Sequence, residues 1–392
     1  MAVNTLSFEQ SATILNSLHS QVTGNQAIAI TDTATFVTVA HTTLQAGYEP
    51  VLNAITQLVG RTIFSNRAYR GRLGSIQVDS QRWGYITRKL QLSDKNWDNE
   101  ASFSLTDGAS VDMYTVNKPN VLQTNFYGQN IVMRYYTILK NQLESAFTGP
   151  EEFGRFLAMV AQNCSDMIEQ KMETVRRMTL ANFIAGKIKA ANGVIHALTE
   201  YNTETGGSYT TTTIMQAANF GPFVQWLYAR MAEISNMMTE RSGLYQIQIT
   251  GHAINRHTPV ADQRVFVLAK YLEAMRARVL ASTYNAGFLN TEGVEPIAFW
   301  QDPLTPDQIK VKPVYLNANG TLTTVTADAD AVEQAGLIGV IFDRDALGVT
   351  VMDETSAVTP LNAKGLYWNQ YYHFIERYWN DFTEKGVIFL LD

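Results

Sequence analysis

The longest run of helically spaced apolar residues in the chain extends from Phe153 to Ile188, mostly at steps of three or four. This spacing places the apolar side chains on one face of an α-helix. The preceding Thr148-Gly149-Pro150 is a typical helix start, because proline is tolerated at the first helical position. The pattern predicts one helix of about forty residues and about 60 Å, at 1.5 Å per residue, that spans the subunit.

Two shorter helical patterns precede this long helix. Residues 6–21 have apolar side chains at helical spacing, and a polar, threonine-rich passage then interrupts the pattern. We interpret residues 1–35 as a detachable N-terminal arm. A second helix is predicted over residues 36–63, and Gly47 and Pro50 are expected to kink or divide it.

Period-two alternation predicts strands on both sides of a long, turn-rich segment. The strand-like runs cover residues 83–87 and 121–127, and Asn, Asp and Gly residues between them supply turn chemistry. The pattern predicts a two-stranded excursion from Arg67 to about Gly128. Because a bare two-stranded ribbon is only marginally stable in water, we expect it to lie on its own body or on a neighbouring copy.

The second half of the chain mixes helical and strand-like patterns. Residues 220–241 and 264–279 have helical spacing, whereas residues 245–250 alternate like a strand. Asn319-Gly320 is typical of a hairpin turn. Four strand-like, aromatic-rich segments then close the chain: 337–342, 349–353, 371–379 and 386–391.

The predicted hairpin separates its charges along the sequence. Residues 61–90 contain seven basic residues and one acidic residue, a net charge of +6, whereas residues 91–112 contain five acids and one base, a net charge of −4. Pairing of basic on acidic segments between subunits explains this division, and so does a solvated hairpin whose charges keep it soluble. The candidate inter-subunit contact residues are Arg82, Arg88, Lys89, Asp94, Asp98 and Glu100.

Composition favours a protein that makes many contacts with other subunits. Only 17% of the 392 residues are charged, below the roughly 25% typical of soluble proteins. The formal net charge of −6 argues against a protein that grips phosphate backbones. The first nine residues lack the pattern of a signal peptide, and no stretch of about eighteen apolar residues predicts a membrane span.

The sequence lacks the common signatures of an active site. It contains no P-loop, no dinucleotide-binding glycine motif, no nucleophile elbow and no zinc-protease helix, and its six histidines are scattered. Asp343 and Asp345 are the best carboxylate pair, and an intracellular hydrolase that uses them is one alternative. We predict no enzyme, no cofactor and no metal site.

The order of these parts resembles that of a known family. It rests on the hairpin that ends in Ile131-Val132-Met133-Arg134-Tyr135-Tyr136, on the helix after Thr148-Gly149-Pro150, and on the closing segments 339–348, 377–382 and 387–391. The chain resembles the major capsid proteins of tailed double-stranded DNA bacteriophages, which have the Hong Kong 97-like fold. Within that family it looks most like the capsid proteins of small podoviruses that infect Gram-positive bacteria.

The resemblance implies an α+β fold with an N-terminal arm, an extended β-hairpin loop, a long spine helix and a mixed axial domain. The expected segments are the arm (1–35), the first part of a peripheral domain (36–66), the extended loop (67–128), the rest of the peripheral domain with the spine helix (129–194), the axial domain (195–336), and the closing strands of both domains (337–392).

The resemblance also implies a structural function. Copies of the chain would form pentamers and hexamers of an icosahedral shell that encloses double-stranded DNA without sequence-specific binding. A separate scaffold protein and a portal are the expected partners, with assembly in the host cytoplasm and no membrane. An encapsulin-like nanocompartment, whose shell encloses an enzyme, is the nearest alternative.

Overall fold

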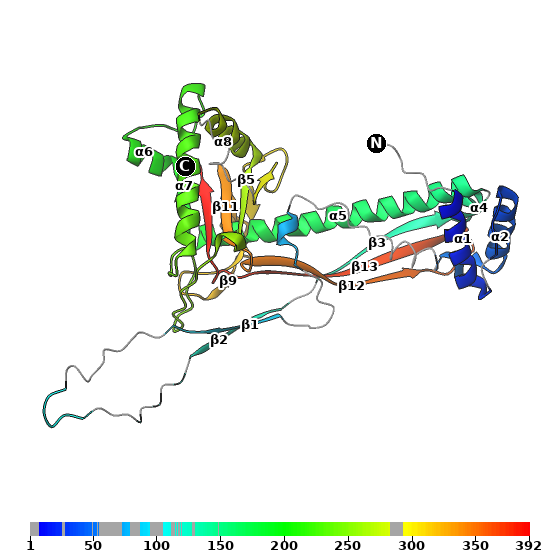
Figure 1. Ribbon diagram of the computed structural model, residues 1–392, viewed down its shortest axis with the longest axis horizontal. Coiled ribbons are helices and arrows are strands. Elements are labelled where there is room, and N and C mark those ends of the chain that lie inside the picture. Colours follow the sequence, from blue (N-terminus) through cyan, green and yellow to red (C-terminus); the bar gives the residue numbers. More distant parts are fainter. Residues whose placement is uncertain are drawn as a thin grey trace.

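The long helix α5 (Pro150–Lys189) is the axis of the molecule, and its 40 residues confirm the predicted length. The computed structural model describes residues 8–25, 28–48, 50–52, 54, 73–78, 87–94, 105–110, 114, 116, 118, 120–127, 130–147, 149–282 and 293–392. Figure 1 shows a mixed lobe at one end of α5 and small helices at the other, with three long strands between them. The molecule is therefore elongated along a single helix.

A three-stranded antiparallel sheet lies along α5. Strand β13 (Tyr367–Asn380) is central, between β3 (Asn130–Leu139) and β12 (Leu347–Val358). Side chains of a strand alternate between the two faces, so one face of β3 packs towards α5 and the other points away from it. On the outward face, Ile131, Met133 and Tyr135 have 60%, 52% and 57% of their surface exposed.

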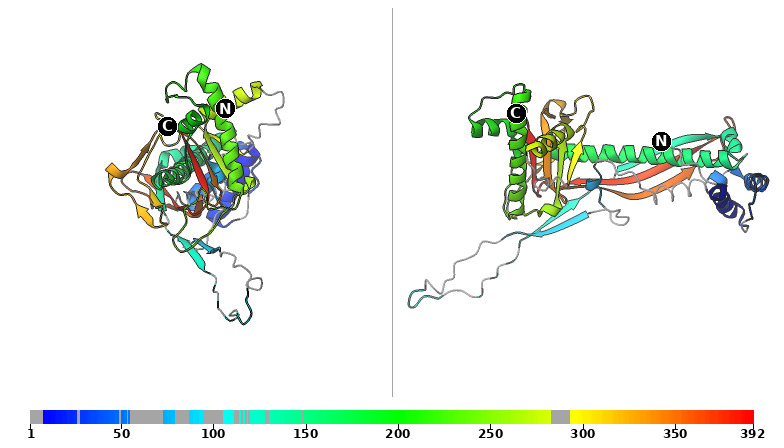
Figure 2. Two further views of the ribbon diagram at one scale, coloured as in Figure 1. Left: turned by 90° about the vertical axis from the view of Figure 1, so that its left-hand side faces the viewer. Right: turned by 45° about the horizontal axis from the view of Figure 1, so that its top comes forward.

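Three small helices form a second hydrophobic core at the end of α5 that is remote from the mixed lobe (Figure 2). They are α1 (Phe8–Thr23), α2 (Thr33–Gln45) and α4 (Lys140–Ala146). Asp32 caps α2, since its Oδ1 accepts a hydrogen bond of 2.7 Å from the backbone N–H of Thr35. Phe36 of α2 packs edge-on against Phe153 of α5, with ring centroids 5.8 Å apart.

The interpretation of residues 1–35 as a detachable arm is wrong for its described part. Leu15 and Leu18 of α1 are fully buried in this second core, against residues of α2 and α5. The apolar face of the first helix thus packs on its own chain, and the described residues of the polar passage lie between two packed helices.

We expect Leu15→Ala to lower the free energy of unfolding of the subunit by about 2–5 kcal/mol, because the substitution opens a cavity in a closed core. Denaturation of the unassembled subunit in urea measures the loss. Ile28→Ala is the control, since Ile28 is 44% exposed and its truncation should change stability by less than about 0.5 kcal/mol. Equal stability of the two variants would restore the interpretation as a detachable arm.

The mixed lobe is built around a five-stranded sheet. Its strand order is β4 (Val194–His196), β14 (Gly386–Leu390), β11 (Leu337–Asp343), β5 (Gln263–Leu268) and β6 (Val294–Ile297). The outer strands β4 and β6 pair in parallel with their neighbours, and the inner pairs are antiparallel. Every residue of β11 and β14 is buried, so these central strands belong to the main core.

Helices and short strands complete the lobe. The helices are α6 (Ala197–Thr205), α7 (Ala217–Thr239) and α8 (Ala269–Ser282). The short strands pair as β7 (Ile309–Val311) with β10 (Val332–Gln334), and as β8 (Val314–Leu316) with β9 (Leu322–Thr324). Single 3-10 turns are η1 (Gly74–Ile76), η3 (Val260–Asp262) and η5 (Asp328–Asp330).

Two local predictions in the lobe are wrong and one is confirmed. Residues 245–250 are irregular rather than a strand, and Tyr245 has a positive φ of 65°. The helix predicted for residues 264–279 begins only at Ala269, because the residues before it form β5. The Asn319-Gly320 turn joins β8 and β9 as predicted, and Gly320 supplies the positive φ of 73°.

The predicted excursion contains a two-stranded antiparallel pair. Strand β1 (Thr87–Leu92) pairs with β2 (Val121–Phe126), with Thr87 opposite Phe126 and Leu92 opposite Val121. We call β1 and β2 together the ribbon; it lies beside the base of the mixed lobe and away from α5 (Figure 1). Residues 83–86 of the first predicted strand lie outside the described residues. The domain boundaries at 36, 67, 129, 195 and 337 stay predictions.

Candidate functional site

The two faces of the ribbon differ in their surroundings. On β1, Lys89 and Gln91 face the body of the chain, and Gln91 is only 8% exposed. On the opposite face Arg88 is exposed, and Leu90 and Leu92 have exposed fractions of 67% and 62%. The ribbon therefore has an anchored face and an outward, partly apolar face.

Lys89 binds two carboxylates of its own chain. Its Nζ lies 2.6 Å from Oδ2 of Asp381 and also contacts Oε1 of Glu384, both in the turn between β13 and β14. The side chains of Asp381 and Glu384 are only 2% and 7% exposed. Burial opposes the charge on Lys89, but the two carboxylates outweigh that effect and raise the pKa of this ammonium group.

A second cation completes the charge balance at this point. Arg256 lies 3.4 Å from Oε1 of Glu384 through its Nη1. Burial raises the pKa of the Glu384 carboxyl, while Lys89 and Arg256 act in the opposite direction by favouring its charged form. We name Lys89, Asp381, Glu384 and Arg256 together the ionic clasp.

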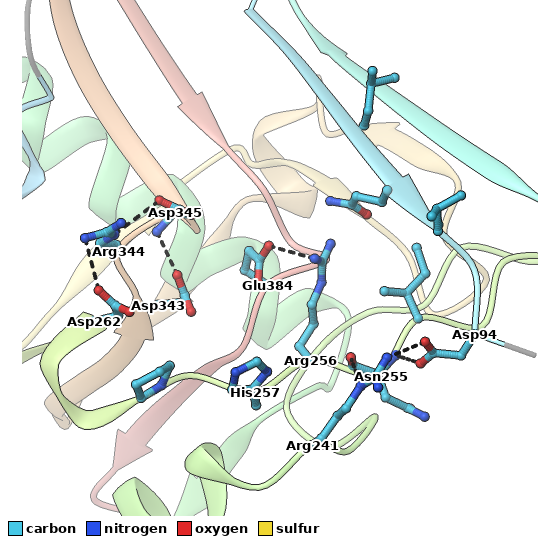
Figure 3. A pocket seen from close by; sticks show the side chains of 15 residues that line it. Asp94, Arg241, Asn255, Arg256, His257, Asp262, Asp343, Arg344, Asp345 and Glu384 are labelled. Atoms are coloured by element: carbon cyan, nitrogen blue, oxygen red, sulfur yellow. Dashed lines mark hydrogen bonds and ion pairs between the residues drawn. The ribbon is translucent and has the colours of Figure 1, made fainter.

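Asp94, just after β1, attaches the C-terminal end of that strand. Its Oδ1 accepts a hydrogen bond from Arg241, and its Oδ2 accepts one of 2.8 Å from the backbone N–H of Asn255 (Figure 3). Its own backbone N–H donates to the carbonyl of Ala253 at 2.7 Å. The segment 241–255 thus holds the end of β1 through both side chain and backbone.

The structure therefore pairs two of the six candidate contact residues, Lys89 and Asp94, within their own chain. Arg88 lies on the outward face of the ribbon, where a neighbouring copy can reach it. The other three candidates, Arg82, Asp98 and Glu100, lie outside the described residues. For all six, contact with another subunit stays a prediction.

Sequence reasoning missed the partners of Lys89 and Asp94. Asp381 and Glu384 are 292 and 295 positions away from Lys89, and no periodic pattern connects them. A local signal was present at the acids themselves, since the polar turn 381–385 interrupts two apolar closing strands. That signal indicates a turn but does not say what the turn binds.

Lys187, in the last turn of α5, joins the same junction. It is fully buried, and its Nζ donates hydrogen bonds to Oδ1 of Asn192 at 2.9 Å and to the carbonyl of Tyr245 at 2.7 Å. Burial lowers its pKa to about 7, although the charges of Asp381 and Glu384 partly oppose this shift. The end of α5 therefore carries an ammonium group that titrates near neutrality.

We expect the subunit to gain stability as the pH rises above 7, through Lys187. Between pH 7 and about 10 the unfolded chain keeps this proton and the folded chain loses it, so the free energy of unfolding rises by about 1 kcal/mol per pH unit. Urea midpoints from pH 6 to 9 measure the slope. The control is Lys187→Met, which removes the titrating group; parallel curves for the two proteins contradict the prediction.

A cavity of about 550 Å³ lies between β1 and the lobe, next to the ionic clasp (Figure 3). Its arginines are already paired: Arg241 with Asp94, Arg256 with Glu384, and Arg344 with Asp262 at 3.0 Å. Because these opposite charges neutralise one another, the described residues that line the cavity offer no cluster of free cations that would attract phosphate groups.

The proposed carboxylate pair has a structural role in this geometry. Oδ2 of Asp343 accepts a hydrogen bond of 2.7 Å from the hydroxyl of Thr258, and Oδ1 accepts one of 2.8 Å from the backbone N–H of Asp345. Asp345 itself is exposed and lies 3.7 Å from Arg344. Oδ1 of Asp343 thus holds the turn after β11, and Oδ2 ties that turn to Thr258.

Neither a metal site nor a membrane span is found among the described residues. Within them, no three His, Cys, Asp or Glu residues are grouped as metal ligands would be. In the same part of the chain, no helix has the length and apolar character needed to cross a bilayer.

Comparison with known proteins finds a matching family model. A family model described as Phi29-like phage major capsid protein matches residues 12–389. No curated protein matches the sequence significantly.

Two solved structures share the fold at low sequence identity. The capsid structure of Staphylococcus phage Andhra has a chain that is 11% identical, with a TM-score of 0.51 over 81% of this chain and 86% of that one. A chain in the structure of the head fiber and inner core protein of native bacteriophage P68 is 12% identical, with a TM-score of 0.54 over 82% and 85%. At such identities the likeness concerns the fold alone.

Proposed function

Because the chain belongs to the Phi29-like phage major capsid protein family, we propose that its copies form pentamers and hexamers of an icosahedral shell around double-stranded DNA. Family membership makes the chain a major capsid protein with the Hong Kong 97-like α+β fold, a structural and non-enzymatic component of the virion. The hydrolase based on Asp343 and Asp345 and the encapsulin-like compartment are therefore set aside.

The outward face of the ribbon is the observation that carries the proposal for how copies meet. Leu90, Leu92 and Val121 are 67%, 62% and 52% exposed there, and Leu92 lies opposite Val121 in the strand pairing. Adjacent exposed apolar side chains of this kind mark interaction surfaces. A second copy of the chain is the natural occupant, since a shell surrounds each subunit with identical ones. Arg88 lies on the same face and is its proposed polar contact.

The outward face of the sheet offers a matching surface. Ile131, Met133 and Tyr135 are more than half exposed there, and the ring of Tyr135 lies 5.4 Å from that of Tyr371 on β13. We assign this face as the receiving surface for the ribbon of a neighbouring copy. Burial of two such apolar faces against each other gives a driving force of about 25 cal/mol per Å².

Charge supports containment of DNA rather than binding to it. A chain with a net charge of −6 releases few condensed counterions when it touches a phosphate backbone, so it gains little from that contact. In the proposal, a separate scaffold protein and a portal take part in assembly, which occurs in the cytoplasm of a Gram-positive host.

Electron microscopy of the purified protein, with and without co-expressed scaffold, tests the proposal. We expect closed shells whose surface lattice contains both fivefold and sixfold capsomers. Open sheets or helical tubes as the sole product, with or without scaffold, would contradict closure by pentamers and hexamers.

A further inference from the structure

On the basis of the proposed contact between the ribbon and a neighbouring copy, we propose that the ribbon's own subunit already holds it in the direction that this contact requires. Two attachments to the mixed lobe hold it: the ionic clasp in the middle of β1, and Asp94 just beyond its C-terminal end. In this arrangement the neighbour does not order the ribbon but meets a surface that is in place beforehand.

In the first attachment, the positive and negative charges balance one another within the subunit. The ammonium group of Lys89 lies between two carboxylates that are almost completely buried, and Arg256 approaches Glu384 from another segment. Removal of Lys89 from this position would leave buried carboxylates with one cation fewer, which is strongly unfavourable in a site of low dielectric. Lys89 is thus a positioning residue whose attraction resists any swing of β1 away from the lobe.

The second attachment holds both strands of the ribbon. Asp94 binds Arg241 and the backbone of segment 253–255, and Nδ2 of Asn120 donates a hydrogen bond of 2.9 Å to the carbonyl of Gly251. The backbone N–H of Ser93 donates to the carbonyl of Asn120 at 2.9 Å, which ties the two strands together at this point. The ends of β1 and β2 therefore meet on segment 241–255.

Two separated attachments fix a direction, which a single one cannot do. Lys89 and Asp94 are five positions apart in an extended chain, a span of about 17 Å at 3.3 Å per residue. Both attachments are made to the same rigid lobe, so rotation of the ribbon about either one is blocked by the other. A ribbon ordered in advance loses less conformational entropy when it binds its neighbour.

Hydrogen exchange of backbone amides in the unassembled subunit tests this inference. In the wild-type subunit we expect slow exchange over residues 87–92 and 121–126, before any shell forms. Lys89→Met keeps the length of the side chain but removes its charge, and should speed exchange in both segments at least tenfold. Arg88→Met is the matched control, since it removes one charge from the same strand on the outward face and should leave exchange unchanged.

Wild-type ribbon amides that exchange as fast as those of an unfolded chain, and slow down only in shells, would overturn the inference. Unchanged exchange in Lys89→Met would do the same. If Lys89→Met does not fold, Arg241→Met loosens the exposed second attachment and is expected to speed exchange near residues 93 and 120. Failure of the proposed function has a separate signature, namely normal shells from variants of the outward face alongside the expected exchange results.

Discussion

Replacement of both Leu90 and Leu92 by aspartate is expected to leave a folded subunit that no longer forms particles. Both side chains are more than 60% exposed, so two added charges cost little in the isolated subunit. In the proposed interface the same charges would be buried without partners, at a cost of several kcal/mol each. The yield of shells should fall at least about a hundredfold, since each 1.4 kcal/mol is a factor of ten.

Sedimentation of the purified variant separates shells from free subunits and measures this yield, and thermal melting checks that the subunit is folded. Leu90→Met with Leu92→Met is the matched control, because it changes the same positions and keeps them apolar, so shells should form. Wild-type yield from the aspartate variant would show that the outward face of the ribbon stays in solvent.

Phe183→Ala is expected to lower the free energy of unfolding of the subunit by about 3–5 kcal/mol. Phe183 is fully buried where α5 enters the main core, stacked on Phe382 with ring centroids 5.5 Å apart and packed 5.8 Å from the ring of Phe342. The loss is a large fraction of the 5–15 kcal/mol typical of a folded protein.

Urea denaturation of the unassembled subunit measures that loss. Met178→Ala lies five residues earlier on the same helix and serves as the control, because its side chain is 63% exposed and should contribute less than about 0.5 kcal/mol. A loss in Phe183→Ala as small as that in Met178→Ala would show that the aromatic packing of Phe183 contributes little to the stability of the subunit.

Local periodicity was sufficient to predict the long helix, but it was not sufficient to predict all the helices and strands of the mixed lobe. The apolar spacing of α5 extends over some eleven turns, so no competing structure matches it. In the segment predicted as a helix from residue 264, the consecutive apolar residues 265–268 fit a buried strand equally well. Pairing with β11, more than seventy positions away, decides in favour of β5, and such pairing leaves no local signal.

The candidate site was predictable in its chemistry but not in its partners. The separation of charge along residues 61–112 predicted either pairing between subunits or a solvated hairpin, whereas Lys89 and Asp94 form ion pairs within their own chain. It does not say that Lys89 turns towards the closing turn of its own chain, because that depends on which face of β1 meets the lobe. The prediction for the first helix was wrong for a related reason: a polar interruption looks the same after a free arm as it does between two packed helices.

The helix α5 connects two separate hydrophobic cores, with Phe153 in one and Phe183 in the other. Inserting or deleting one residue between these two phenylalanines would rotate the cores relative to each other by about 100° and shift them by about 1.5 Å. The strands that run alongside α5 between the two cores would then no longer match the helix in length. Length changes during evolution are therefore expected in the loops and not in this segment. The fixed distance between the two cores would then keep the length of the subunit constant.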